Sequence, residues 1–222
     1  MLEAKNISKI YSLGNKEILA LDNVSFRIND GEFVAITGQS GSGKSTLMNI
    51  LGCLDSASSG EYYIDGKRID RLSSGRLCKI RSLKIGFVFQ NFSLVPTLTA
   101  YENIELPLVY RGFSLKKRSE RVNEALKSVG MLERRDHLPS QLSGGQMQRV
   151  AIARAVAGQP SVILADEPTG NLDRKNTEEV MSLLSSLNKD GKTIILVTHD
   201  SRVASRAERI IKLSDGKIDS DG

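Results

Sequence analysis

The distribution of apolar residues predicts strands in two different environments. Residues 2–11 and 19–28 alternate apolar and polar positions on either side of a turn at 12–17, a pattern that favours half-buried antiparallel strands. Other segments are almost continuously apolar, which favours strands buried on both faces of a parallel sheet. These segments are residues 32–37, 161–166 and 193–198. Two short strands around an Asp-Gly turn are expected within 209–219.

Residues 92–157 differ from the rest of the chain because their pattern is mostly helical. They lie between apolar strands at 85–90 and 161–166, so we expect a helical subdomain inserted into an α/β core. The breaks expected between its helices are at Pro96, Pro107, Gly130 and Pro139. The helices expected elsewhere are 44–53, 174–189 and 200–207.

Composition places the chain among ordinary globular domains. It has 222 residues, of which 40% are hydrophobic and 26% charged, enough for one large domain. No apolar run approaches the roughly 18 residues that span a bilayer, and the first residues do not resemble a signal peptide. Cys53 and Cys78 fit no metal-binding spacing, so a reducing, cytoplasmic setting is expected.

The net charge of +5 raises the question of an anionic partner. The densest basic run, residues 111–121, has only Phe113 as an interleaved aromatic residue, which favours a solvated helix face over a nucleic-acid groove. We expect no nucleic-acid partner. Attraction of this run to an acidic membrane surface stays open as an alternative.

A glycine-rich segment, GQSGSGKST, follows the buried strand at 32–37 and opens a helix, as the phosphate-binding P-loop requires. Its glycines let successive N–H groups turn inward. Lys44 would supply positive charge to the β- and γ-phosphates, and the Ser45 hydroxyl would ligate Mg²⁺. The residues expected to hold the phosphates are Gly38, Gln39, Ser40, Gly41, Ser42, Gly43, Lys44, Ser45 and Thr46.

Polar side chains at the ends of other strands complete a candidate catalytic site. Asp166 is placed to hold Mg²⁺, and Glu167 to polarise the attacking water as a general base. Gln90 could coordinate the cation and orient water, and His199 could hold the γ-phosphate and the water. The carboxyl ends of parallel strands meet at one edge, so these groups are expected near Lys44.

Two further features concern the nucleotide. Tyr11 is one of few aromatic residues near the N-terminus and could stack on the adenine, with core packing as the even alternative. The segment LSGGQ, residues 142–146, runs into a second helix whose first N–H groups are suited to an anion. The chain therefore has two potential phosphate-binding helix starts about a hundred residues apart.

Taken together, these motifs resemble the nucleotide-binding subunit of an ABC transporter over essentially the whole chain. Their order and spacing match the P-loop, the Q-loop at Gln90, the LSGGQ signature, the Walker B strand 162–167, the D-loop 170–173 and the switch His199. The fold implied is a single α/β domain: a P-loop NTPase core with a mostly parallel central sheet, an N-terminal antiparallel β subdomain and an inserted α-helical subdomain. The boundaries implied are 1–91 and 158–222 for the core, and 92–157 for the helical part.

The resemblance also implies a role for the second helix start, the one at LSGGQ. In this family the signature of one subunit faces the ATP held by the P-loop of the other, so ATP joins a homodimer and ADP releases it. The residues that would act across the interface are Ser143, Gly144, Gly145, Gln146 and Asp173. A helix N-terminus carries about half a positive charge, which suits the γ-phosphate.

Finer features resemble the branch containing macrolide-exporter, lipoprotein-releasing and antimicrobial-peptide-export ATPases, with a cell-division ATPase as a near relative. The resemblance implies ATP and Mg²⁺ as ligands and docking on a membrane permease with a large extracytoplasmic domain, at the cytoplasmic face of the membrane. A pair that transmits force or signal rather than transporting is an open alternative. A non-membrane ATPase is disfavoured, because there is no long heptad run and only one cassette.

Overall fold

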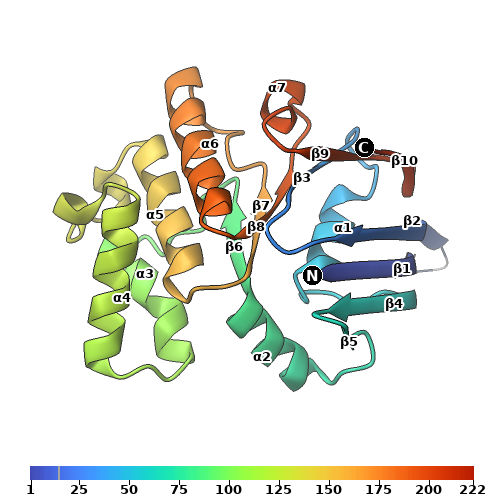
Figure 1. Ribbon diagram of the computed structural model, residues 1–222, viewed down its shortest axis with the longest axis horizontal. Helices are drawn as coiled ribbons and strands as arrows, with labels where there is room; N and C mark the ends of the chain where they lie inside the picture. Colours follow the sequence, from blue (N-terminus) through green and yellow to red (C-terminus); the bar gives the residue numbers. More distant parts are fainter. Residues whose placement is uncertain (15) are drawn as a thin grey trace.

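The computed structural model describes residues 1–14 and 16–222, so the predicted turn at 12–17 falls partly outside the described residues. Two sheets organise the molecule (Figure 1). The first has four antiparallel strands in the order β2-β1-β4-β5. These strands are β1 (Leu2–Leu13), β2 (Lys16–Ile28), β4 (Ser59–Ile64) and β5 (Lys67–Arg68). The antiparallel β subdomain expected at the N-terminus is therefore confirmed.

The second sheet has six strands in the order β10-β9-β3-β8-β7-β6, and only β10 runs antiparallel to its neighbour. Its strands are β3 (Phe33–Thr37), β6 (Ile85–Phe89), β7 (Val162–Asp166), β8 (Thr193–Val197), β9 (Arg209–Ser214) and β10 (Lys217–Asp221). Strand β8 is buried at all five positions, as its continuous apolar pattern predicts. The mostly parallel sheet is confirmed.

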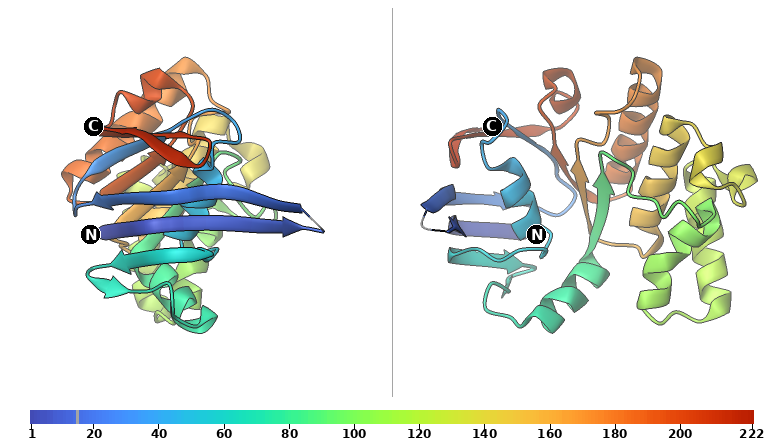
Figure 2. Two further views of the ribbon diagram at one scale, coloured as in Figure 1. Left: turned by 90° about the vertical axis from the view of Figure 1, so that its right-hand side faces the viewer. Right: turned by 180° about the vertical axis from the view of Figure 1, so that it is seen from behind.

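Helices lie on both sides of this sheet, with α1 between the two sheets and most of the others on the opposite side (Figures 1 and 2). Three of them, α3, α4 and α5, pack together at one edge of the molecule (Figure 1). They share an apolar core that includes Ile104, Leu126 and Val150. The α-helices are α1 (Lys44–Leu51), α2 (Ser74–Lys84), α3 (Ala100–Tyr110), α4 (Leu115–Ser128), α5 (Gly144–Ala157), α6 (Arg174–Lys189) and α7 (Ser201–Ala204). Short 3-10 turns occur at Leu132–Arg134 and Pro139–Gln141. Within the described part of the chain, no helix is long and apolar enough to cross a bilayer.

Some sequence expectations are wrong in detail. Pro107 does not interrupt a helix but lies inside α3. Its ring removes one N–H donor, yet Arg111 N still donates to the Pro107 carbonyl (3.2 Å), and fully buried Ile104 and Leu108 hold the helix against the core. The helix expected at 200–207 is only the four residues of α7.

Candidate functional site

The P-loop connects β3 to α1 through a backbone that only glycine fits at two positions. Gly43 has φ 99°, and a Cβ there would lie 2.6 Å from the Ala20 carbonyl oxygen of β2. At Gly38 (φ 152°) a Cβ would lie 2.5 Å from Ser42 Oγ and overlap the main chain of β9. The loop is therefore packed tightly on both sides and its main chain has one conformation.

Helix α1 begins without a side-chain cap, because its N-cap residue is Gly43. Its first N–H groups are thus available to an anion rather than to a neighbouring side chain. Lys44 Nζ donates to the carbonyl oxygens of Gly38 (2.8 Å) and Gln39 (2.7 Å), which places the ammonium across the mouth of the loop. This cradle of main-chain donors and one cation fits a polyphosphate.

A cavity of about 400 Å³ opens beside this loop, and we call it the P-loop cavity. Six phosphate-loop residues, the polar ends of β7 and β8, and part of β2 surround it. Its lining comprises Ile18, Leu19, Ala20, Ser40, Gly41, Gly43, Lys44, Ser45, Thr46, Asp166, Glu167, Val197 and His199. The structure thus brings together the P-loop, the two acids and the histidine, as the shared strand edge predicts.

Asp166 ends β7 and faces the P-loop cavity from the centre of the sheet. Burial and the neighbouring Glu167 carboxylate raise the pKa of Asp166, while the Lys44 ammonium lowers it in part. A buried carboxylate close to another carboxylate and to a cradle for phosphates is a site where a divalent cation offsets the repulsion. The donor set of hydroxyl and carboxylate oxygens fits Mg²⁺.

Glu167 is held in place by the end of β8. Its backbone has φ 45°, and its N–H donates to the Val197 carbonyl (2.9 Å). Its carboxylate accepts hydrogen bonds from Thr198 Oγ1 (3.2 Å) and from the backbone N–H of His199 (3.0 Å). His199 Nδ1 lies 2.6 Å from Glu167 Oε1, so an ionised Glu167 fixes the hydrogen on Nδ1 and leaves Nε2 for the cavity.

Two predicted site residues lie beside the P-loop cavity and do not belong to its lining. The Gln90 amide packs against Gly170, where a Cβ would come 2.6 Å from Gln90 Nε2. Tyr11 donates its hydroxyl hydrogen to Asp55 Oδ2 (2.8 Å), with Lys9 Nζ 4.8 Å from the centre of its ring. Burial and the hydrogen bond to Asp55 raise the pKa of Tyr11, although a contact with Thr46 of α1 opposes the shift.

The signature residues lie at the start of α5, away from the P-loop cavity. The β6–β8 strands separate α5 from α1 in Figures 1 and 2. Ser143 and Gln146 cap each other: Ser143 Oγ accepts from Gln146 N (3.3 Å), and Gln146 Oε1 accepts from Ser143 N (2.9 Å). Gly144 faces Leu172, with room for a Cβ at 3.5 Å. Within one chain, the start of α5 is therefore too remote from the P-loop cavity to contact a ligand bound there.

Asn176 is a residue of this region that the sequence does not single out. Asp173 caps α6 by accepting from Asn176 N (2.8 Å) and Asn176 Nδ2 (2.9 Å). The same Asn176 side chain fills the space where a Cβ of Gly145 would lie. The Asn176 amide thus connects the D-loop to the signature helix. A polar residue in the first turn of a helix is common, so no sequence pattern identifies Asn176.

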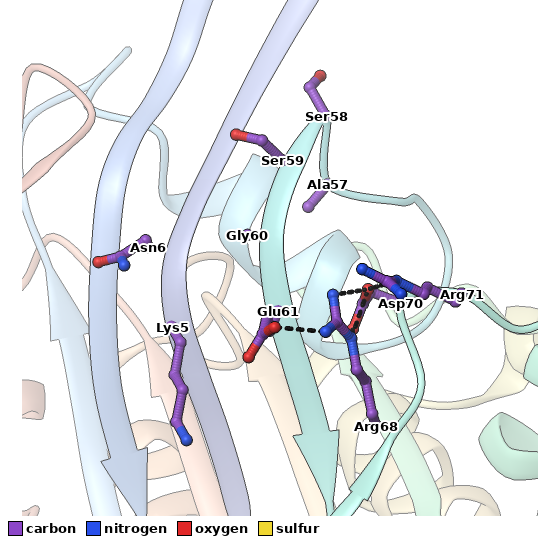
Figure 3. Close-up of a pocket in the computed structure, with 10 residues that line it drawn as sticks. All are labelled: Lys5, Asn6, Ala57, Ser58, Ser59, Gly60, Glu61, Arg68, Asp70 and Arg71. Atoms are coloured by element: carbon purple, nitrogen blue, oxygen red, sulfur yellow. Dashed lines mark hydrogen bonds and ion pairs between the residues drawn. The ribbon is translucent and has the colours of Figure 1, made fainter.

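A larger hollow, of about 730 Å³, lies on the antiparallel sheet and not at the strand ends (Figure 3). Its two acids are already paired, because Arg68 contacts both Glu61 and Asp70. Burial works against ionisation of Asp70, but hydrogen bonds from Arg68 and from Tyr62 N lower its pKa overall. None of the P-loop residues or strand-end acids lines this hollow.

Known proteins share both the sequence and the fold. A model of the ABC transporter family matches residues 21–170. The uncharacterised ABC transporter ATP-binding protein MJ0796 of Methanocaldococcus jannaschii is 55% identical, over 99% of this chain and 95% of its own length. The macrolide export ATP-binding/permease protein MacB of Hyphomonas neptunium is 50% identical over 100% of this chain, which spans 34% of that longer protein.

A solved structure has the same architecture. It is the dimeric, post-hydrolysis state of the ATP-binding cassette MJ0796 bound to ADP and Pi, with a TM-score of 0.92 and 51% sequence identity. The match covers 100% of this chain and 98% of the other. With the family match over most of the chain and the strand-end chemistry beside a P-loop, the chain belongs to the ABC transporter family as an ATP-binding component that hydrolyses ATP.

Proposed function

We propose that this chain works as a homodimer that binds two ATP molecules between its subunits and hydrolyses them with Mg²⁺ to drive a membrane permease. The observation that carries the proposal is the separation of two anion-binding helix starts. The P-loop cavity contains Lys44, Asp166, Glu167 and His199, but the signature at the start of α5 lies elsewhere. A second copy would bring its signature to this cavity.

The P-loop would hold the phosphates of ATP mainly by its main chain. Residues 38–46 would supply inward N–H groups, and Lys44 would exchange its two carbonyl partners for the β- and γ-phosphates. Tyr11 lies next to α1 and would stack on the adenine from there.

Ser45, Asp166 and Gln90 would hold Mg²⁺. Their oxygen atoms are the ligands that this cation prefers, and the bound ion would supply positive charge to the phosphate oxygens. Gln90 would need to leave its position against Gly170 to take part. This movement would couple the cavity to the segment that follows β6.

Glu167 would accept a proton from the attacking water, as a general base. Its three contacts with Thr198 and His199 hold the carboxylate at the cavity wall. His199 would keep Glu167 oriented through Nδ1 and present Nε2 to the γ-phosphate. The two residues would therefore act as one unit at the same edge of the sheet.

The neighbouring subunit would complete each site. Gly144 and Gly145 would present their N–H groups at the start of α5, together with the Ser143 hydroxyl. Gln146 fixes that start by capping, and Asp173 caps the start of α6. The dimeric form of the 51%-identical cassette bound to ADP and Pi supports this arrangement. Loss of the γ-phosphate would remove negative charge from the signature helix and weaken the dimer.

A groove of about 290 Å³ between α2 and α3 is suited to a helix of the membrane permease. Phe87, Phe89 and Pro107 give it apolar walls, and Ser93 connects it to the segment after Gln90. The macrolide export ATP-binding/permease relatives support an export role with a permease. The chain would work at the cytoplasmic face of the membrane, on a permease with a large extracytoplasmic domain. A permease that transmits force or signal would use the same groove.

Light scattering on Glu167→Gln tests the proposal. With ATP and Mg²⁺ this variant should change from monomer to dimer and show no turnover, because it binds ATP without a base to activate water. With ADP it should stay monomeric. Adding Ser143→Arg should abolish the dimer while ATP binding persists. Normal turnover by Glu167→Gln would exclude the general-base role, and an ATP-independent mass would contradict the switch.

A further inference from the structure

The turn between α3 and α4 exposes apolar side chains. Tyr110 is 86% exposed, Leu115 74% and Val109 44%, whereas Phe113 between them turns inward against the core of α3–α5. Three large apolar residues on one protruding turn lose contact with water only if something covers them. Their exposure is therefore a feature of a surface that meets a partner.

This turn has a fixed conformation. Gly112 has φ 72° and its N–H donates to the Val109 carbonyl (2.9 Å), while Ser114 caps α4. Arg111 stacks over the Phe113 ring at 5.1 Å and donates to the Gly158 carbonyl at the end of α5. The exposed residues are thus presented on a rigid support, which lowers the entropy lost on binding.

Positive charge surrounds the apolar turn. The first turn of α4 contains Lys116, Lys117 and Arg118 and no acidic residue, although a helix N-terminus favours acids. Lys117 pairs with Glu120 and Arg118 with Glu105, but Lys116 is exposed and has no ion pair among the described residues. Arg111 and Arg121 add two further cations without an ion pair in the described part of the chain, and burial with the nearby charge of Arg121 lowers the pKa of Arg111.

Helix α2 presents a similar surface at the same end of the molecule. It has no buried residue and no acidic residue, and it exposes Arg76, Lys79 and Leu83, the last at 42%. Figures 1 and 2 show α2 and the α3–α4 turn at the same lower end in each view. Ser82 of α2 and Arg111, which directly follows α3, line the same groove of about 290 Å³.

We propose that these two elements rest on anionic phospholipid headgroups, with Tyr110 and Leu115 in the interfacial layer and Arg76, Lys79 and Lys116 among the phosphates. Tyrosine combines an apolar ring with a polar tip that suits this layer. Basic side chains near an anionic leaflet are attracted to it. A broad negative surface can meet both elements at once, whereas a protein segment would occupy the groove between them. This lipid contact rests on the proposed function, in which the chain works on a permease at the membrane surface.

Sedimentation with lipid vesicles tests this contact on the isolated chain. The probe is vesicles of 30% phosphatidylglycerol in phosphatidylcholine, compared with phosphatidylcholine alone, at low and high salt. We expect binding to the anionic vesicles only, weakened by salt. Lys116→Ala should lower partitioning about fivefold, and Tyr110→Ser with Leu115→Ser about tenfold. Lys189→Ala, an exposed lysine at the end of α6, is the matched control and should bind normally.

The outcomes are decisive in both directions. Equal binding to both vesicle types, no binding, or an equal loss in Lys189→Ala would overturn the proposal. So would normal vesicle binding by Tyr110→Ser/Leu115→Ser together with lost stimulation by the permease, because the turn would then contact protein. ATP-dependent dimerisation of the same variants in the Glu167→Gln background is measured separately. Loss of dimerisation there would concern the proposed function and not the lipid contact.

Discussion

The side-chain amide of Asn176 occupies the space in which a Cβ of Gly145 would lie, with Asn176 Cγ 2.5 Å from that position. The same amide donates to Asp173 at the start of α6. Two helices that carry residues of the proposed dimer interface are therefore fitted to each other through one glycine and one asparagine. A change in either residue should move the other helix.

Gly145→Ala should destabilise the fold by about 1–3 kcal/mol, because the added methyl group must displace an amide that is hydrogen-bonded to Asp173. Asn176→Ala alone should have a smaller effect. In the double variant the overlap with the Asn176 amide is gone and only Asn176 Cβ, at 3.0 Å, stays close, so the two changes should couple by about 1 kcal/mol. Urea denaturation of all four proteins measures this coupling. Strictly additive effects would show that the two helices adjust independently.

Arg154 fixes the segment after Gln90 to the signature helix. Its guanidinium donates to the carbonyl oxygens of Phe92 (2.9 Å) and Ser93, two residues with positive φ of 58° and 49°. Arg154→Ala should therefore lower the free energy of unfolding by about 2–3 kcal/mol and speed amide exchange at 91–95. Arg149→Ala, which removes a surface pair with Glu179, is the control and should leave that exchange unchanged.

The raised pKa of Asp166 predicts a pH-dependent stability without nucleotide. Burial and Glu167 favour the protonated form in the folded state, so this contribution is present at low pH and is lost as pH rises through the folded pKa. Asp166→Asn should raise Tm at pH 7–8 in the absence of Mg²⁺ and ATP, and the gain should vanish below the ordinary pKa of aspartate. Calorimetry across pH checks the sign. A lower Tm of Asp166→Asn at pH 8 would mean that the carboxylate is stabilising.

A charge in the segment after Gln90 should uncouple ATP hydrolysis from the permease. Leu94 packs partly against the core of α3–α5, so Leu94→Glu would disturb folding as well. Val95 is 37% exposed and gives the cleaner variant. Val95→Glu should retain the ATPase activity of the isolated chain and lose stimulation by the permease. If the isolated activity also falls, this segment affects the nucleotide site directly.

The strand-end chemistry was predictable because continuous apolar runs identify buried parallel strands, whose carboxyl ends must meet. Asp166, Glu167 and His199 follow from this rule together with the P-loop spacing. The positions of Gln90 and Tyr11 did not follow, since their side chains make local contacts with Gly170 and Asp55 that no spacing encodes.

The sequence pattern was also silent on α2, β4 and β5. Helix α2 has no fully buried residue, and only Leu77 and Ile80 pack partly against the core, which is too short an apolar stripe to predict it from. Pro107 misled in the opposite direction, because tertiary packing of Ile104 and Leu108 outweighs one lost hydrogen bond. Arg154 and Asn176 act through backbone and amide contacts between distant segments, and only the folded chain shows these.

The tight packing of the P-loop has a consequence for how this sequence can change over time. The donors that we propose for phosphate are main-chain N–H groups, which no substitution of a neighbouring side chain removes. Gln39 and Ser40 are therefore free to drift, but Gly38 and Gly43 are fixed by the main chains of β9 and β2 behind them. Mutational tolerance in this loop should alternate sharply from one residue to the next, and it should be governed by the main chain of the strands packed behind the loop.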